Sequence, residues 1–202
     1  MFHVGSVKSV LSTPAFIRYW QWERVRDIGG QMNNRYLKAC TLARAKHKGQ
    51  MYGDLPYYVH LEAVSRLASP FGTNAMIVAQ LHDVMEDTGT GINELISDFG
   101  FVVADAVKYI SDSQLPDRKS RKEEINGRLS VLSPDEESAR IALIVKACDR
   151  LANVRASLSC KENYYEQYQM EHADFRKAVY RQGLCEAIWW ELDNLLRHSE
   201  AS

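Results

Sequence analysis

Four ionisable side chains, those of His82, Asp83, Glu86 and Asp87, lie within six consecutive positions at the end of an otherwise apolar segment. Apolar residues at helical spacing predict a helix over residues 74–85. On such a helix His82 and Glu86 are one turn apart, and so are Asp83 and Asp87. Because an unpaired charge is costly to bury, these groups need a partner, and a divalent cation would serve. A structural, hydrogen-bonded His-Asp pair is the alternative.

A second imidazole, His60, lies on the inward face of a helix predicted over residues 57–69 and opened by Pro56. Only a short turn separates this helix from the one over residues 74–85. Helices joined so closely pack as neighbours, so we expect His60 to lie near His82. The alternative is a core histidine that makes hydrogen bonds and binds no metal.

A further carboxylate, Asp149, lies amid the apolar pattern of a helix predicted to be capped by Ser133 and to run to about Ser157. Lys146 and Asn153 lie one turn before and one turn after Asp149, and they share its face. The alternative role for Asp149 is an internal ion pair with Lys146.

The candidate ligands are two imidazoles and two carboxylates: His60, His82, Asp83 and Asp149. Such a set suits one Mn²⁺, Fe²⁺ or Zn²⁺ ion, with water in the remaining positions. Nitrogen ligands make Mg²⁺ a poorer fit. An ion of this kind lowers the pKa of bound water, so that hydroxide forms near neutral pH. Glu86 and Asp87 would then orient that water or move its proton.

Two basic segments are candidates for contacts with an anionic substrate. Lys46 and Lys48 lie at the end of a helix predicted over residues 34–48, where they either complement the helix dipole or contact phosphate. Residues 118–122 belong to a strongly charged stretch, which is either a solvated face or a source of cations for a polyanionic substrate.

The composition of the chain limits the class of protein and the cellular compartment that we expect. Its 202 residues suffice for one domain with an extension, and 46% hydrophobic with 25% charged residues is typical of a globular protein. The net charge of −1 gives no field that would attract nucleic acid or an anionic membrane. No run has the length of a transmembrane helix, and residues 1–16 lack the apolar centre of a signal peptide. With four scattered cysteines, we expect free thiols and a cytoplasmic protein; no pattern indicates its oligomeric state.

No segment has a convincing strand pattern, so the fold class predicted for the whole chain is all-α. The remaining predicted helices lie over residues 91–100, 101–110 and, as one or two helices, 162–198. Aromatic residues of the last segment, such as Trp189 and Trp190, are interpreted as core. Residues 1–33 are expected to form a short helical extension, and residues 34–200 to form a single domain.

The order His60, His82-Asp83-x-x-Glu86-Asp87 and Asp149 resembles the HD superfamily of metal-dependent phosphohydrolases. More closely, the chain resembles the alarmone hydrolases, which are the hydrolase half of RelA/SpoT enzymes and their stand-alone relatives of the Mesh1 type. The matching stretches are His47-Lys-Gly-Gln50, Leu55-Pro-Tyr-Tyr-Val-His60, Leu81-His-Asp-Val-Met-Glu-Asp-Thr88, Phe99-Gly100 and Lys146-Ala-Cys-Asp-Arg-Leu-Ala-Asn153. The HDxxED form is more specific than HD alone.

This resemblance implies an HD-domain helical bundle with one Mn²⁺ on the four candidate ligands. It implies hydrolysis of the 3′-pyrophosphate of (p)ppGpp, the alarmone of the stringent response, to GDP or GTP and pyrophosphate. Glu86 and Asp87 match the catalytic acidic pair of the family. The expected substrate contacts are Lys46, Lys48, Tyr52, Lys146 and Asn153, with Asn153 toward the nucleoside.

One stretch departs from the family pattern. Where the family has an Arg-Lys pair after the Gln of HxGQ, this chain has Met51-Tyr-Gly-Asp54. Tyr52 could stack on a base but supplies no charge, which Lys46, Lys48 or residues 118–122 would have to provide. The departure leaves open another nucleotide substrate: an adenosine alarmone, the 2′-phosphate of NADPH or a nucleoside monophosphate. A non-catalytic nucleotide-sensing module is a further alternative.

Overall fold

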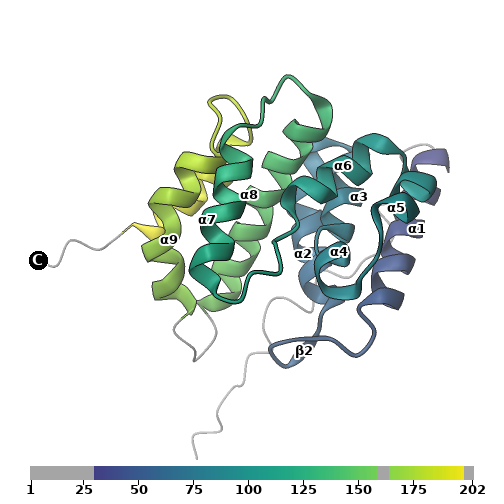
Figure 1. Cartoon of the computed structure of the whole chain (residues 1–202), viewed down its shortest axis with the longest axis horizontal. Helices are drawn as coiled ribbons and strands as arrows, with labels where there is room; N and C mark the ends of the chain where they lie inside the picture. Colours follow the sequence, from purple (N-terminus) through teal and green to yellow (C-terminus); the bar gives the residue numbers. More distant parts are fainter. Residues whose placement is uncertain (1–29, 159–163, 198–202) are drawn as a thin grey trace, which may run out of the picture.

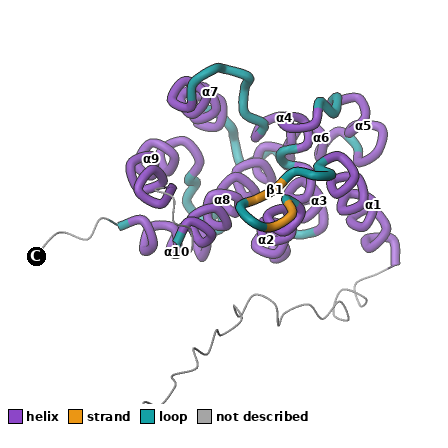
Figure 2. Tube along the Cα trace, turned by 90° about the horizontal axis from the view of Figure 1, so that it is seen from below, coloured by secondary structure: helices purple, strands orange, loops and turns teal. Residues whose placement is uncertain are grey.

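The computed structural model describes residues 30–158 and 164–197, which form a bundle of helices with one small hairpin (Figures 1 and 2). The elements in chain order are α1 (Gly30–Lys46), β1 (Met51–Tyr52), β2 (Leu55–Pro56), α2 (Tyr58–Ala68), the 3-10 turn η3 (Ser69–Phe71), α3 (Thr73–Leu81), α4 (Val84–Thr88), α5 (Ile92–Phe99), α6 (Phe101–Ile110), α7 (Arg118–Ser130), α8 (Glu137–Ser157), α9 (Tyr164–Val179) and α10 (Glu186–Leu196). The predicted helical fold is confirmed. The extension expected over residues 1–33 lies outside the described residues, except where α1 begins.

The longest helix, α8, runs through the middle of the bundle. In Figures 1 and 2 it separates α1 to α6 on one side from α7, α9 and α10 on the other. It packs against α2, α3, α6, α9 and α10. Because other helices surround α8, it buries apolar residues on most of its circumference, including Ala142, Leu143, Val145, Ala147 and Leu151. A polar residue on α8 is thereby carried into the centre of the protein.

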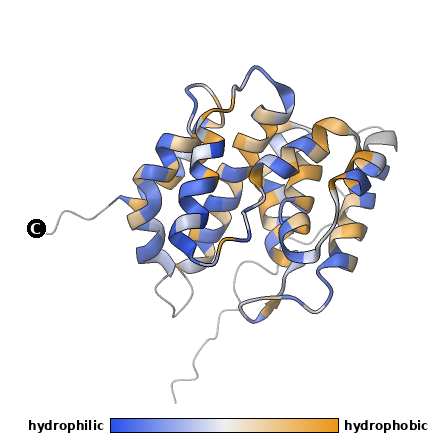
Figure 3. Ribbon diagram, viewed as in Figure 1, coloured by the Kyte–Doolittle hydropathy of each residue, from blue (hydrophilic) through white to orange (hydrophobic). Residues whose placement is uncertain are grey.

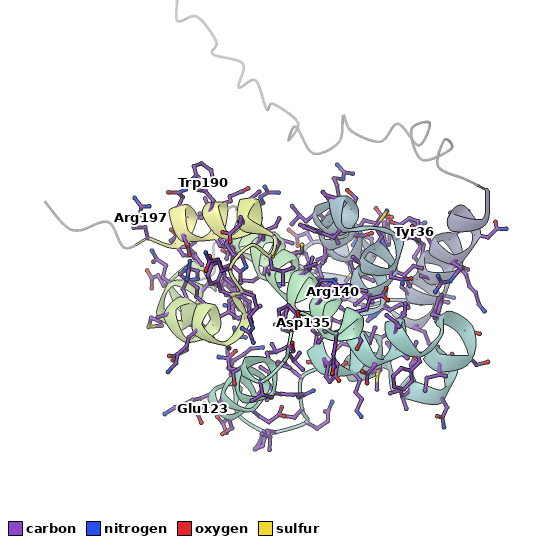
Figure 4. The ribbon with its side chains drawn as sticks, turned by 90° about the horizontal axis from the view of Figure 1, so that it is seen from above. Tyr36, Glu123, Asp135, Arg140, Trp190 and Arg197 are labelled. Carbon is purple, nitrogen blue, oxygen red and sulfur yellow. The ribbon has the colours of Figure 1, made fainter. Side chains whose placement is uncertain are left out.

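The apolar core lies mainly on one side of α8. Figure 3 shows hydrophobic residues concentrated in α2, α3, α6 and α8, whereas α7 is largely hydrophilic. The fully buried side chains include Leu61 on α2 and Ile77 on α3. Helix α7 attaches through Ile125 and Leu129, while Glu123 is exposed on its outer side (Figure 4). Within the described ranges, no helix is both long enough and apolar enough to cross a membrane.

The helix predicted over residues 74–85 is interrupted, and the prediction of one continuous helix was wrong. Helix α3 ends at Leu81 and α4 begins at Val84, and Asp83 between them has φ −102° and ψ −1°. On an unbroken helix, adjacent side chains point about 100° apart. The break instead brings His82 and Asp83 to one point, with 2.9 Å between His82 Nε2 and Asp83 Oδ2.

The hairpin was not predicted. β1 pairs with β2 in antiparallel fashion, with Met51 opposite Pro56 and Tyr52 opposite Leu55. Two-residue strands are too short to produce an alternating pattern, which explains why no strand was predicted here. Pro56 belongs to β2 and does not open the following helix, since α2 begins at Tyr58.

One predicted helix start was wrong, and one helix was not predicted. Ser133 does not cap α8: its Oγ accepts a hydrogen bond from the backbone N–H of Asp135 (3.3 Å), and the helix begins only at Glu137. The charged stretch before α8 forms α7, whose start is capped by Asp117, with 2.8 Å from its Oδ1 to the backbone nitrogen of Ser120.

The aromatic residues of the last helices divide between core and surface. Trp189 is 1% exposed and packs against Phe175 and Tyr180, at 5.8 Å and 5.6 Å between ring centroids. The adjacent Trp190 is 72% exposed and projects from the outer face of α10 (Figure 4). The interpretation as core is confirmed for Trp189 and was wrong for Trp190.

Candidate metal centre

Three side chains from separate elements meet at one buried point. His60 comes from α2, His82 from the break between α3 and α4, and Asp149 from α8, and one ligand atom of each lies within 4.8 Å of the others. Asp149 Oδ1 is 3.2 Å from His60 Nε2 and 3.6 Å from His82 Nε2, and the two imidazole nitrogens are 3.3 Å apart. Two imidazole nitrogens and a carboxylate oxygen converging in this way fit a divalent transition-metal ion.

The ring of His82 is fixed by its backbone neighbour. Its Nδ1 donates a hydrogen bond to the carbonyl oxygen of Ala79 at 2.9 Å. Because a carbonyl only accepts, this contact puts the proton on Nδ1 and leaves the lone pair of Nε2 for the centre. Metal-binding histidines commonly have such an anchor, and it supports the choice of His82 as a ligand.

Asp83 lies at the edge of the cluster. Its Oδ2 lies beside His82 Nε2 and accepts a hydrogen bond from the hydroxyl of Tyr57. Burial alone would raise the pKa of Asp83, but its interaction with His82 holds that pKa below its usual range. Burial and the neighbouring Asp83 carboxylate raise the pKa of Tyr57. Tyr57 therefore stays protonated and orients Asp83, whose role as a fourth ligand remains a prediction.

Of the acidic pair, Glu86 lines both cavities and Asp87 lines only the smaller one. Glu86 lines the main cavity with His60, Asp83 and Asp149, and its Oε2 accepts a hydrogen bond from the backbone nitrogen of Asp112 at 2.9 Å. Burial raises the pKa of Glu86, and the Asp112 and Asp83 carboxylates raise it further. Asp87 instead accepts a hydrogen bond from Gln50 Nε2 at 2.7 Å, and it lines a smaller neighbouring cavity to which Glu86 also contributes.

The main cavity has a volume of about 270 Å³ and is strongly polar. Its acidic and metal-binding side is lined by Tyr57, His60, Asp83, Glu86, Asp112, Asp149 and Asn153. The other residues that line it, five of them cationic, are called the cationic wall: Arg118, Arg121, Lys122, Lys146, Arg150, Tyr168 and Phe175. A cavity with candidate metal ligands and five cationic side chains suits a substrate with several phosphate groups.

The sequence located this cationic side only in part. Arg118, Arg121 and Lys122 of the charged stretch line the cavity, as the interpretation in terms of a polyanionic substrate requires. The predicted contacts Lys46 and Lys48 do not line it. Lys46 forms an ion pair with Glu94 at 3.0 Å, and Lys48 is exposed.

Lys146 forms the ion pair considered for it with Asp149, and it also lines the main cavity. Its Nζ donates a hydrogen bond to the carbonyl oxygen of Ile110 (3.1 Å) and lies 3.6 Å from Asp112 Oδ1 and 3.9 Å from Asp149 Oδ2. Burial alone would lower the pKa of Lys146, but the surrounding carboxylates, Asp112 first, raise it. Lys146 is therefore a buried cation that lies between the carboxylates of Asp149 and Asp112.

Glu171 was not identified as a site residue from the sequence, and it organises the cationic wall. Its carboxylate oxygens accept hydrogen bonds from Arg118 Nε (2.8 Å), Arg118 Nη2 (3.2 Å) and Arg150 Nη1 (2.9 Å). The Arg150 guanidinium also lies over the rings of Phe175 (4.3 Å) and Tyr168 (4.8 Å). In the sequence, Glu171 lies 53 positions from Arg118 and 21 positions from Arg150. No local spacing could therefore reveal these contacts.

Glu171→Ala should destabilise the protein by about 1–3 kcal/mol, because Arg150, with a side chain only 8% exposed, loses its carboxylate partner. Urea denaturation followed by circular dichroism measures the loss. The control is Glu166→Ala, an exposed position on the same helix, which should change stability by no more than about 0.5 kcal/mol. Equal stability of the two variants would show that the arginines do not depend on Glu171.

No protein-family model matches the chain. Among curated proteins, it is 32% identical over 151 residues to the guanosine-3′,5′-bis(diphosphate) 3′-pyrophosphohydrolase MESH1 of Xenopus tropicalis, covering 71% of this chain and 81% of that protein. It is 30% identical over 142 residues to MESH1 of Homo sapiens, covering 67% of this chain and 76% of that protein. A GTP pyrophosphokinase of Streptomyces antibioticus is 29% identical over 165 residues, which are 78% of this chain but only 19% of that protein.

A solved structure shares the fold. It is that of a metazoan ortholog of SpoT that hydrolyzes ppGpp, with a TM-score of 0.68, 22% sequence identity, and coverage of 81% of this chain and 94% of that one. The likeness extends over most of the described helices, and it agrees with the bundle predicted from the sequence.

Proposed function

The chain belongs to the family of MESH1-type pyrophosphohydrolases and RelA/SpoT hydrolase domains, and from this premise we propose that it removes the 3′-pyrophosphate of (p)ppGpp in a metal-dependent reaction. The observation that carries the proposal is that His60 and Asp149, two members of the cluster with His82, line one cavity with five cationic side chains. A water oxygen would form the new bond to phosphorus while the bond from phosphorus to the ribose 3′ oxygen breaks. The products would be pyrophosphate and GDP or GTP.

Each side of the cavity has a part in this reaction. His60, His82 and Asp149, with Asp83 beside them, would hold one Mn²⁺, and Fe²⁺ or Zn²⁺ would also suit the donor atoms. Such an ion supplies Lewis acidity, which lowers the pKa of water at the site. Glu86, with its raised pKa, would accept the proton of the attacking water.

The cationic wall would hold the phosphate groups of the substrate. Arg118, Arg121 and Arg150 carry planar guanidinium groups that match phosphate oxygens, and Lys122 adds a further charge. Asn153, which also lines the cavity, would contact the nucleoside.

Product analysis after incubation of the Mn²⁺-loaded protein with ppGpp tests the proposal. We expect pyrophosphate and GDP, and we expect EDTA or His82→Ala to abolish both products because each removes the metal. The proposal fails if ppGpp stays intact while the same preparation cleaves another nucleotide.

One observation favours a second candidate, the same chemistry on another nucleotide. The hairpin that replaces the usual Arg-Lys stretch contributes no cation to the cavity wall, since all five cavity cations come from α7 and α8. An adenosine alarmone, the 2′-phosphate of NADPH and nucleoside monophosphates therefore belong in the same assay as ppGpp. Tyr52→Arg should then shift the preference toward ppGpp.

A further inference from the structure

Tyr52, on β1, contacts the metal centre in two different ways. Its ring stacks on the imidazole of His60, with 4.7 Å between centroids and 23° between the ring planes. Its hydroxyl donates a hydrogen bond to Asn153 Oδ1 at 2.8 Å, and Asn153 Nδ2 in turn donates to Asp149 Oδ1 at 2.6 Å. One side chain outside the ligand set thus reaches two of the three ligands.

The two histidine ligands differ in how they are held. His82 is anchored by the hydrogen bond from its Nδ1 to Ala79, but Nδ1 of His60 is buried and has no hydrogen-bond partner among the described residues. The orientation of the His60 ring therefore depends on packing. Besides the stacked ring of Tyr52, the ring contacts on His60 are Tyr57 (5.6 Å, 54°) and the other ligand, His82 (5.2 Å, 60°).

The backbone holds Tyr52 in place for this role. It pairs with Leu55 in the hairpin, and Gly53 makes the turn with φ +58°, a conformation that suits glycine. The ring of Tyr52 also meets that of Tyr57 edge to face at 6.2 Å between centroids. Tyr57 orients Asp83, so the hairpin and the residue after it brace three of the candidate ligands.

We propose that Tyr52 is a positioning residue of the metal centre, which holds the His60 ring by stacking and the Asp149 carboxylate through Asn153. This inference rests on the proposed function only in that the centre binds a divalent cation. It assigns Tyr52 a different task from the base stacking expected from the sequence. In this arrangement the amide of Asn153 is occupied on both sides, by Tyr52 and by Asp149.

Isothermal titration of the metal-free full chain with MnCl₂ alone tests the proposal. Partners that orient metal ligands commonly contribute about 10–100-fold to metal affinity. We therefore expect Tyr52→Leu, which removes the stack and the hydroxyl, to weaken Mn²⁺ binding by about 10–100-fold. Tyr52→Phe keeps the stack and should weaken binding less, by about 3–10-fold on the same scale.

The matched control is Tyr180→Phe, which removes a tyrosine hydroxyl that donates to Glu186 on the other side of the protein. It should bind Mn²⁺ as the parent does, and circular dichroism checks that all variants are folded. If both Tyr52 variants bind Mn²⁺ within twofold of the parent and show only a raised KM, Tyr52 contacts the substrate and the proposal is wrong. Should Tyr52→Leu not fold, the isosteric Tyr52→Phe decides alone. A parent that binds no Mn²⁺ would overturn the proposed function together with this inference.

Discussion

Asp149→Asn should abolish both metal binding and hydrolysis. Asp149 supplies the one carboxylate oxygen of the three-residue cluster, and it lies within 3.6 Å of both histidine ligands. Asparagine has nearly the same shape, but it carries no charge to offset a divalent cation. Because a metal contributes several kcal/mol to the stabilisation of charge in the transition state, we expect turnover to fall by at least about 10³-fold.

Titration with Mn²⁺ and measurement of kcat on the same preparations check this expectation. Asp174→Asn is the matched control, since Asp174 is an exposed aspartate on α9, away from the cluster. It should bind metal and turn over substrate as the parent does. A non-catalytic nucleotide-sensing module would give the opposite result, with Asp149→Asn and the parent binding nucleotide alike and neither turning it over.

The candidate metal cluster could be predicted because each of its residues stands out in the periodic pattern of its own segment. His60 and Asp149 are polar residues at positions where the periodicity of α2 and α8 requires buried ones, and burial of such groups calls for a partner. The short link through η3 then explains why His60 and His82 come together. Local periodicity and short connections were sufficient for this part of the site.

The rest of the site depends on contacts that local periodicity does not encode. The break at His82 and Asp83 contains neither glycine nor proline, so the sequence gives no sign that the helix stops there. The cationic wall joins α7 and α8 to Glu171 on α9, and the aromatic rings around Arg150 look like ordinary core positions in the sequence. Such groups acquire a role only when the packing of α7, α8 and α9 is known.

Charge placement also explains how the candidate metal ligands and the cationic wall can lie in one cavity. Lys146 and Lys122 both lie near Asp112, at 3.6 Å and 2.5 Å, so the carboxylate separates two cations that would otherwise repel each other. The Asp112 carboxyl keeps its charge, since the neighbouring lysines, Lys146 first, lower its pKa against the effect of burial. Alternating charges thus run from Asp149 through Lys146 and Asp112 to Lys122 on α7.

Glu86→Gln should lower kcat by about 10²–10⁴-fold, the usual contribution of a positioned proton acceptor, while leaving Mn²⁺ affinity close to that of the parent. The reason is its location: Glu86 lines the main cavity together with His60 and Asp149 but is not part of the three-residue cluster. Its pKa is raised by burial and by the Asp112 and Asp83 carboxylates, which makes it a better base for a reaction near neutral pH.

Asp87→Asn provides the comparison, because the two acidic residues are neighbours that match the same family motif. The Asp87 carboxylate is turned toward Gln50 and lines only the smaller cavity, so its substitution should affect kcat much less than that of Glu86. Steady-state kinetics of both variants, with Mn²⁺ titrations as the check on the centre, separates the two roles. If Asp87→Asn costs as much as Glu86→Gln, the reacting phosphate must reach toward the smaller cavity, where Glu86 and Arg121 also contribute to the wall, and the two cavities would form one continuous site.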